Sequence, residues 1–192
     1  MGRVTLFDEM TLDGYFQGVR DWDLDFHQPP DREIGPYTNQ LNRDSGALLL
    51  GRVTYEGLAA AFQSKRGKVA SVLNALPKYV FSRTLRQPSW DNSTIVRTGP
   101  PGAVRRLKRE IRKDLQIVGS AALAAVLSRA GLIDEYRLWL NPTVLGRGKP
   151  LFPPSRRPTS MRLLEARSMP SGRVLLRLEP RYTERRNASE AE

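Results

Sequence analysis

The 192-residue sequence predicts an α/β fold, because short apolar runs rich in β-branched residues alternate with segments of helical period. Two runs, 46–50 and 115–118, are almost continuously apolar, as is typical of central strands covered on both faces. The run 173–179 alternates apolar and polar side chains, which indicates a strand with one wetter face. These patterns predict a sheet flanked by helices.

Eight strands and four helices are predicted. The Pro170-Ser171-Gly172 turn joins the last two strands into an antiparallel hairpin, and Gly131 is expected to end the last helix. The strands are expected at 4–10, 46–50, 78–82, 94–97, 115–118, 135–141, 161–167 and 173–179, and the helices at about 31–43, 54–62, 102–113 and 121–130.

The length suits one α/β domain, which we place at residues 1–180. Residues 181–192 are mostly polar and charged, offer no apolar run that could build a core, and are expected to form a flexible tail. The chain has no cysteine, which excludes disulfides, thiolate zinc sites and cysteine nucleophiles, and no metal is expected. It shows neither a signal peptide nor a membrane-spanning run, so we expect a cytoplasmic protein without a membrane partner.

The net charge of +11 allows a nucleic-acid surface, anionic substrates or only a basic proteome. The basic residues are spread along the chain, and the densest run, 105–113, contains no aromatic residue that could stack on a base. We therefore expect a solvated basic face and no nucleic-acid partner.

Three segments that follow predicted strands have the form of anion sites. In the first, Gly51 allows close backbone approach, the helix starting at Thr54 directs free N–H groups at a phosphate, and Arg52 matches phosphate oxygens. The alternative is a tight turn, with Thr54 as a helix cap and Arg52 as a surface charge. Both interpretations stay open for this segment alone.

The other two segments follow the strands at 78–82 and 115–118. Ser82 and Arg83 place a hydroxyl beside a guanidinium, which suits an isolated phosphate such as the 2′-phosphate of NADPH, although a polar loop has the same sequence. The third segment, Gly119-Ser120-Ala121, connects a predicted strand to a predicted helix. Such a segment can bind a pyrophosphate, but a plain strand-to-helix turn has the same sequence pattern. In a mainly parallel sheet all three segments converge on one edge, which favours one phosphate-rich ligand.

Taken in order, several short motifs resemble the RibD C-terminal-domain family, a reductase module that shares its fold with dihydrofolate reductase. The resemblance covers roughly residues 3–179. The motifs are Leu12-Asp13-Gly14-Tyr15, Leu50-Gly51-Arg52-x-Thr54-Tyr55-Glu56, Pro77-Lys78-Tyr79-Val80-x-Ser82-Arg83-Thr84, Val118-Gly119-Ser120, Gly131-Leu132-Ile133-Asp134-Glu135 and Pro142-x-x-Leu145-Gly146-x-Gly148-x-Pro150-Leu151-Phe152.

The resemblance implies a three-layer αβα fold with a mixed, mostly parallel eight-stranded sheet, NADPH at its carboxyl edge, and a homodimer. It implies that the first segment holds the adenosine-side phosphates, the second the 2′-phosphate and the third the pyrophosphate. The loop of Asp13 and Tyr15 would approach the nicotinamide and the substrate. Glu135 is interpreted as structural, and Gly146 and Gly148 as shaping a turn near the pocket.

The catalytic acid is not fixed by the resemblance. Asp13 and Asp31 are the candidates, although Asp31 also suits a helix cap. Trp22 is expected in the substrate pocket or in the core, and His27 in a nearby loop. A bifunctional enzyme with a zinc deaminase domain is excluded, since the chain lacks cysteine and has one histidine.

The predicted function is hydride transfer from NADPH to a C=N or C=O group of a small substrate, with a pterin- or pyrimidine-like heterocycle or a carbonyl compound expected. The first alternative is a nucleotide-binding protein that has kept the fold without reductase turnover. The second, a basic nucleic-acid-binding protein, lacks a recognition motif.

Overall fold

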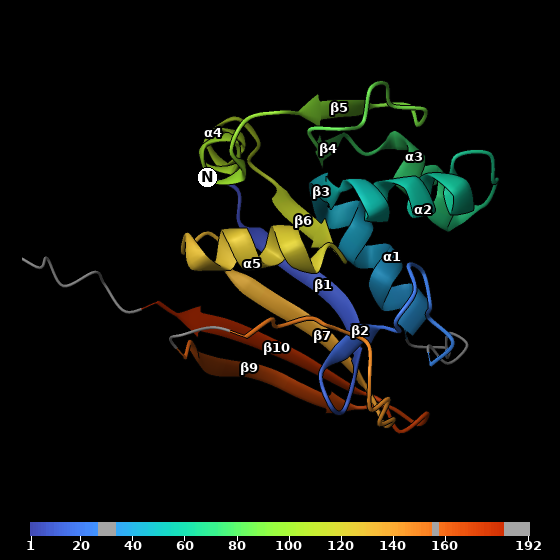
Figure 1. Cartoon of the computed structure of the whole chain (residues 1–192), viewed down its shortest axis with the longest axis vertical. Coiled ribbons are helices and arrows are strands. Elements are labelled where there is room, and N and C mark those ends of the chain that lie inside the picture. The colour runs from blue at the N-terminus through green and yellow to red at the C-terminus, as the bar shows by residue number, and fades with distance from the viewer. Residues whose placement is uncertain (27–33, 155–157, 183–192) are drawn as a thin grey trace, which may run out of the picture.

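The computed structural model describes residues 1–26, 34–154 and 158–182. Its main sheet has eight strands, and a small second sheet has two (Figure 1). The strands of the main sheet are β1 (Val4–Thr11), β3 (Ser45–Gly51), β4 (Lys78–Phe81), β5 (Ser93–Val96), β6 (Asp114–Val118), β7 (Glu135–Asn141), β9 (Ser160–Ser168) and β10 (Val174–Arg181); β2 (Tyr15–Gln17) and β8 (Lys149–Pro150) form the small sheet. The helices are α1 (Ile34–Asp44), α2 (Arg52–Phe62), α3 (Lys68–Ala75), α4 (Pro100–Glu110) and α5 (Ala121–Arg129).

The main sheet is mixed and mostly parallel, with the order β5-β4-β3-β6-β1-β7-β10-β9. Pairing is parallel from β5 to β7, and β10 runs antiparallel to both β7 and β9. Gly172, with φ +81°, lies in the tight turn between the last two strands. The predicted eight-stranded sheet and its terminal hairpin are confirmed.

Helices cover both faces of the sheet, which gives three layers (Figure 1). Alternate residues of β3 face opposite layers: Ala47 and Leu49 pack with α4 and α5, whereas Leu48 and Leu50 pack with α2 and α3. Helix α1 packs on the second face over β7 and β10, where Trp139 is fully buried. The nearly continuous apolar runs therefore belong to strands covered on both sides, as predicted.

Some elements differ from the prediction. Helix α3 was not predicted; it is short, lies between Gly67 (φ +128°) and Pro77, and depends on burial of Ala70 and Leu73 against the sheet. Strands β2 and β8 were also not predicted, since each is only two or three residues long. The described part of the first predicted helix begins at Ile34, and Asp31 and His27 lie outside the described residues.

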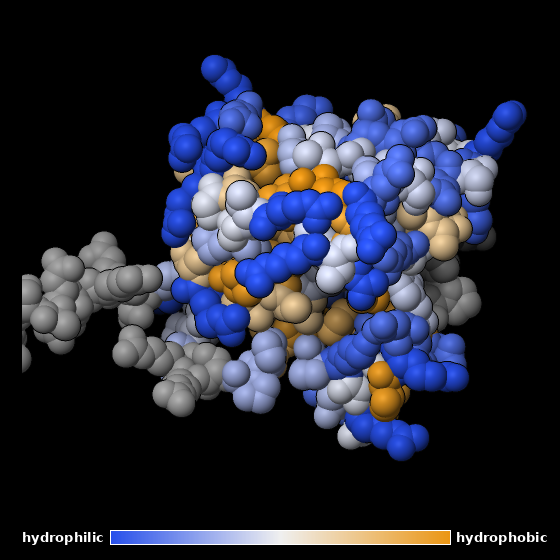
Figure 2. Space-filling view, turned by 45° about the horizontal axis from the view of Figure 1, so that its top comes forward, coloured by the Kyte–Doolittle hydropathy of each residue, from blue (hydrophilic) through white to orange (hydrophobic). Residues whose placement is uncertain are grey.

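Helix α4 has the predicted apolar stripe and basic outer face, with one exception. Val104 and Leu107 are buried, and Arg105 and Arg106 are exposed. Lys108 turns inward and its Nζ lies 2.6 Å from Oδ2 of Asp134. Hydrophilic side chains cover most of the face shown in Figure 2, while apolar side chains reach the surface near its centre. No helix in the described ranges is long and apolar enough to cross a membrane.

A buried carboxylate ties together the amino end of β7 and the strands around it. Glu135 is fully buried and lies within 3.0 Å of guanidinium nitrogens of Arg3, Arg137 and Arg177. Burial alone would raise the pKa of Glu135, but the hydrogen bonds from Arg177 and Arg137 outweigh it and hold the pKa at about 2. This placement agrees with the structural role expected for Glu135.

Glu135→Gln is expected to lower the free energy of unfolding at pH 7 by about 3 kcal/mol, because the partly buried guanidinium groups of Arg137 and Arg177 lose the buried anion that they bind. The stabilisation by Glu135 is fully present above the usual carboxyl pKa of about 4.5 and is lost as the pH falls toward about 2. Urea unfolding at pH 7 and pH 3 measures both effects, so the gap between wild type and variant should narrow at pH 3. Glu110→Gln, which removes an exposed ion pair with Arg106, is the control and should change stability by less than about 1 kcal/mol. An equal gap at both pH values would contradict the prediction.

Candidate functional site

The three predicted anion segments follow neighbouring strands. β4, β3 and β6 are adjacent and parallel, and Gly51 at the end of β3 pairs with Phe81 at the end of β4. Leu49 pairs with Ile117, so β6 ends at nearly the same level. The carboxyl ends therefore lie side by side at one edge of the sheet, which is where open α/β sheets bind ligands.

Two of these segments are directly linked by the Ser120 hydroxyl. Its Oγ accepts a hydrogen bond from the Gly51 N–H at 2.8 Å and donates one to Oγ1 of Thr54 at 2.8 Å. Gly119 has φ +54°, and a Cβ at this position would lie 3.3 Å from Cγ2 of Thr54. A side chain at position 119 would thus be both strained and crowded. The loop that leaves β6 is held against the first turn of α2.

The N-termini of α2 and α5 lie at this edge, and neither helix has a side-chain cap. Ser120 is the N-cap of α5 in a left-handed conformation (φ 59°, ψ 55°), but its hydroxyl bonds across to Gly51 and Thr54. Ala121 is the first residue of α5. The first N–H groups of both helices are thus left for solvent or an anion, and the helix dipoles favour negative charge there.

The basic side chains predicted at the site differ in their contacts. Arg52 is exposed and forms an ion pair with Glu56 one turn along α2, at 2.8 Å. Ser82 Oγ accepts hydrogen bonds from the Thr84 and Leu85 amides and shapes the loop after β4. Arg83 is exposed, and its side chain has no ion pair within the described residues. Arg83 is therefore available for an anion, whereas Arg52 would have to share its charge with Glu56.

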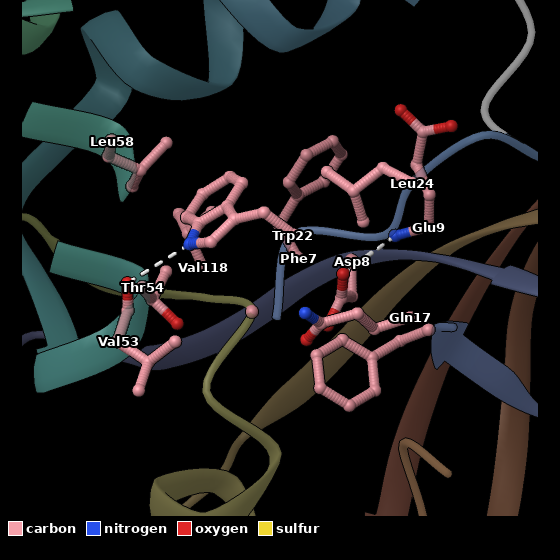
Figure 3. A pocket seen from close by; sticks show the side chains of 12 residues that line it. Phe7, Asp8, Glu9, Gln17, Trp22, Leu24, Val53, Thr54, Leu58 and Val118 are labelled. Carbon is pink, nitrogen blue, oxygen red and sulfur yellow. Dashed lines mark hydrogen bonds between the residues drawn. The ribbon is translucent and has the colours of Figure 1, made fainter. Parts of the chain in front are cut away.

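A cavity of about 150 Å³ adjoins these loops (Figure 3). It lies where β6 leaves the sheet: the pairing of β1 with β6 ends at Phe7 and Val118, while β1 continues beside β7 to Thr11. The lining is mainly apolar and includes no basic side chain among the described residues. The residues are Phe7, Asp8, Glu9, Phe16, Gln17, Trp22, Leu24, Val53, Thr54, Leu58, Val118 and Gly119.

Trp22 forms a wall of the cavity by docking on α2. Its Nε1 donates a hydrogen bond to the Val53 carbonyl at 3.2 Å (Figure 3). The indole lies so close to Gly57 that a Cβ there would collide with it. Trp22 has φ +61°, an unusual value for a bulky residue, so its surroundings hold the backbone in this conformation. Of the two predicted locations, the structure places Trp22 at the cavity.

The sequence analysis did not single out Asp8, which lies in the cavity wall. Its side chain is 8% exposed; Oδ1 accepts a hydrogen bond from the Glu9 amide at 3.0 Å, and Oδ2 is buried without a partner among the described residues. Burial raises the pKa of Asp8 well above its usual value, and the nearby Glu9 carboxylate adds to the shift. Two adjacent acidic residues inside the predicted strand 4–10 were the available signal, because burying a charge is costly.

Asp13 and Tyr15 organise loops and do not line this cavity. The Asp13 carboxylate accepts hydrogen bonds from the Thr11 hydroxyl (2.6 Å) and from the Gly146 and Leu145 amides. The Thr11 hydrogen bond, helped by these amides, lowers the pKa of Asp13 to about 2. Tyr15 lies on β2 beside Pro150 of β8. Asp13 thus fastens the loop after β7 to the loop after β1.

The predicted turn near the pocket contains two glycines in constrained positions. Gly146 has φ +75° and donates its N–H to Asp13. Gly148 packs against the backbone of Gln17, a residue of the cavity wall, and leaves no room for a side chain. The turn therefore supports the cavity from outside.

The comparisons with known proteins agree with this arrangement. Residues 3–175 match the RibD C-terminal domain. The uncharacterized protein YyaP of Bacillus subtilis is 30% identical over 181 residues, which are 90% of this chain and 92% of YyaP. A putative riboflavin biosynthesis protein of Shewanella sp. PV-4 superposes with a TM-score of 0.76 at 18% identity, over 94% of this chain and 99% of that one. A pyrimidine reductase-like protein of Corynebacterium diphtheriae gives 0.65 at 15% identity, over 95% and 93%.

The three-layer fold and its strand order define an α/β protein of the dihydrofolate-reductase-like class. The carboxyl edge of the sheet carries the uncapped helix ends, and the cavity described above adjoins it. Within this class the chain belongs to the RibD C-terminal domain family, a family of reductase modules. The predicted family and fold are confirmed.

Gly57→Ala is expected to displace the Trp22 indole from α2, because the methyl group occupies the space of the ring. Trp90 and Trp139 are 3% and 0% exposed, so acrylamide quenching of tryptophan fluorescence reports mainly on Trp22, which is 39% exposed. Quenching should increase clearly in the variant. Gly102→Ala on α4, where the added methyl group meets no atom within 4 Å, is the matched control. Unchanged quenching in Gly57→Ala would show that the indole does not rest on this helix.

Proposed function

We propose that this protein is an NADPH-dependent reductase that transfers hydride to a C=N or C=O group of a small, pterin- or pyrimidine-like heterocyclic or carbonyl substrate. The observation that carries the proposal is the convergence of three strand ends on one edge, next to a largely apolar cavity. Two structural neighbours, a putative riboflavin biosynthesis protein and a pyrimidine reductase-like protein, support the same reaction class. NADPH would supply the hydride, and the protein would supply orientation and electrostatics.

The residues at the edge fit a phosphate-rich dinucleotide. The two uncapped helix ends would hold phosphates: Gly51, Arg52 and Thr54 on the adenosine side, and Gly119, Ser120 and Ala121 at the pyrophosphate. A cofactor bound there would extend toward the cavity, because Thr54 and Gly119 belong to both the loops and the cavity wall. Ser82 and Arg83, one strand further from the cavity, would meet the 2′-phosphate.

We also propose that the protein is a homodimer, as its family resemblance implied, and that it is cytoplasmic, as the sequence led us to expect. The exposed edge strand β9 supports a dimer, because Leu163 is 57% exposed and Leu164 is 37% exposed on it. Analytical ultracentrifugation decides this point, and a monomer at micromolar concentration would contradict it.

Titration of the protein with NADPH and NADH, followed by nicotinamide fluorescence, tests the cofactor assignment. Wild-type protein is expected to prefer NADPH, and Arg83→Ala should weaken NADPH binding roughly 10-fold while changing NADH binding little, since only NADPH carries the 2′-phosphate. Arg105→Ala, an exposed arginine on α4, is the charge-matched control. Equal losses for the two nucleotides would remove Arg83 from the 2′-phosphate site, and no binding of either would overturn the reductase proposal.

Gly119→Ala is expected to weaken NADPH and NADH by similar factors of about 10 or more, because the pyrophosphate is common to both. The methyl group would strain a backbone with φ +54° and press on Thr54. The same titration provides the measurement, with Gly102→Ala as the control. If Gly119→Ala weakened the binding of NADPH but not of NADH, the pyrophosphate would not bind at Gly119.

A further inference from the structure

Asp8 lies at the point where the sheet opens next to the proposed cofactor loops. On one side β1 loses its partner after Phe7, and on the other side it stays paired, with Asp8 beside Leu138 of β7. The open side faces the cavity, whose opposite wall is formed by Val118 and Gly119. A group in this position lies inside the sheet edge and close to the place where the reactive end of a cofactor would enter.

The surroundings of Asp8 favour a neutral carboxylic acid. The side chain is 92% buried, its Oδ2 has no hydrogen-bond partner within the described ranges, and no lysine or arginine lines the cavity there. This is unusual in a chain with 31 basic residues. Among the described residues, the one other carboxyl group of the lining belongs to Glu9, whose negative charge opposes ionisation of Asp8.

The two carboxyl groups point in different directions. Successive side chains of a strand alternate between faces, and Figure 3 shows the Asp8 carboxyl on the inner side of the cavity, whereas the Glu9 carboxylate points away from it. The remaining polar side chains of the lining are amide, hydroxyl and indole groups, which do not release a proton near neutral pH. Asp8 is therefore the acid that a bound substrate would meet.

We propose that Asp8 is the catalytic proton donor of the reductase, an assignment that rests on the proposed function. When a C=N or C=O carbon accepts the hydride that NADPH supplies, the π electron pair moves to the nitrogen or oxygen. The Asp8 O–H bond breaks and its proton joins that atom, so the substrate gains H⁻ and H⁺ and is reduced by two electrons. The carboxylate left on Asp8 regains its proton from solvent after product release.

The first experiment measures the protonation of Asp8 without any substrate. In protein labelled with ¹³C at the aspartate side-chain carboxyl carbon, one resonance should have the chemical shift of a protonated acid at pH 7. It should disappear in Asp8→Asn and remain in Asp25→Asn, an exposed aspartate of the neighbouring loop. If every aspartate is ionised at pH 7, Asp8 cannot donate a proton there and the proposal is overturned.

The second experiment measures binding and turnover separately. Asp8→Asn keeps the side-chain shape, so NADPH affinity should stay within about twofold of wild type, while NADPH oxidation with 7,8-dihydropterin as the probe falls about 10²–10⁴-fold. Asp8→Glu should be faster than Asp8→Asn, and the pH above which its rate of NADPH oxidation falls should differ from that of wild type. Unchanged turnover in Asp8→Asn, with NADPH bound normally, overturns the assignment of Asp8 alone. Failure of wild-type protein to bind NADPH overturns the proposed function and the role of Asp8 with it.

Discussion

The early end of the β1–β6 pairing determines most of what this fold can do. After Phe7 and Val118 the two strands separate, because β6 turns away through the left-handed conformations of Gly119 and Ser120, while β1 continues beside β7. The separation leaves one side of β1 unpaired within an otherwise continuous sheet. Burying the backbone N–H and C=O groups of an unpaired strand side costs free energy unless they find other hydrogen-bond partners. Here the gap is the cavity, and the same turn that opens it brings the N-terminus of α5 to its rim.

The hydroxyl of Ser120 makes this geometry rigid. It accepts a hydrogen bond from the Gly51 amide and donates one to Oγ1 of Thr54, so it links the loop after β6 to the start of α2. A side chain at the N-cap usually satisfies its own helix. Ser120 instead spans two helix ends, and it leaves the first amides of α5 unfilled. A preorganised anion site requires backbone N–H groups that are held in place and have no other acceptor. The position of Ser120 provides such groups at the start of α5, and the helix loses its side-chain cap as a result.

The sequence was sufficient to predict features that depend on local pattern. Glycine directly after an apolar run predicted the strand ends at Gly51 and Gly119, and parallel strands then required the two segments to lie at one edge. The sequence was not sufficient to predict features that depend on where the pairing between two neighbouring strands ends. Alternation within β1 cannot show that β6 ends beside Phe7, so the exposure of Asp8 to a cavity was not predictable. The contact between Trp22 and Gly57 likewise joins positions 35 residues apart.

Positive charge is unevenly distributed at this site, which the net charge of +11 does not show. The loops at the sheet edge present two helix N-termini and the guanidinium of Arg83, which has no ion pair within the described residues, and these groups attract anions. The cavity behind them is lined mainly by apolar side chains, with the buried carboxyl group of Asp8 in its wall, and the lining includes no basic side chain among the described residues. A ligand that suited both regions would be anionic at one end and largely apolar at the other. Because the two regions share Thr54 and Gly119, this polarity would orient a phosphate-bearing ligand before any contact with its ring is made.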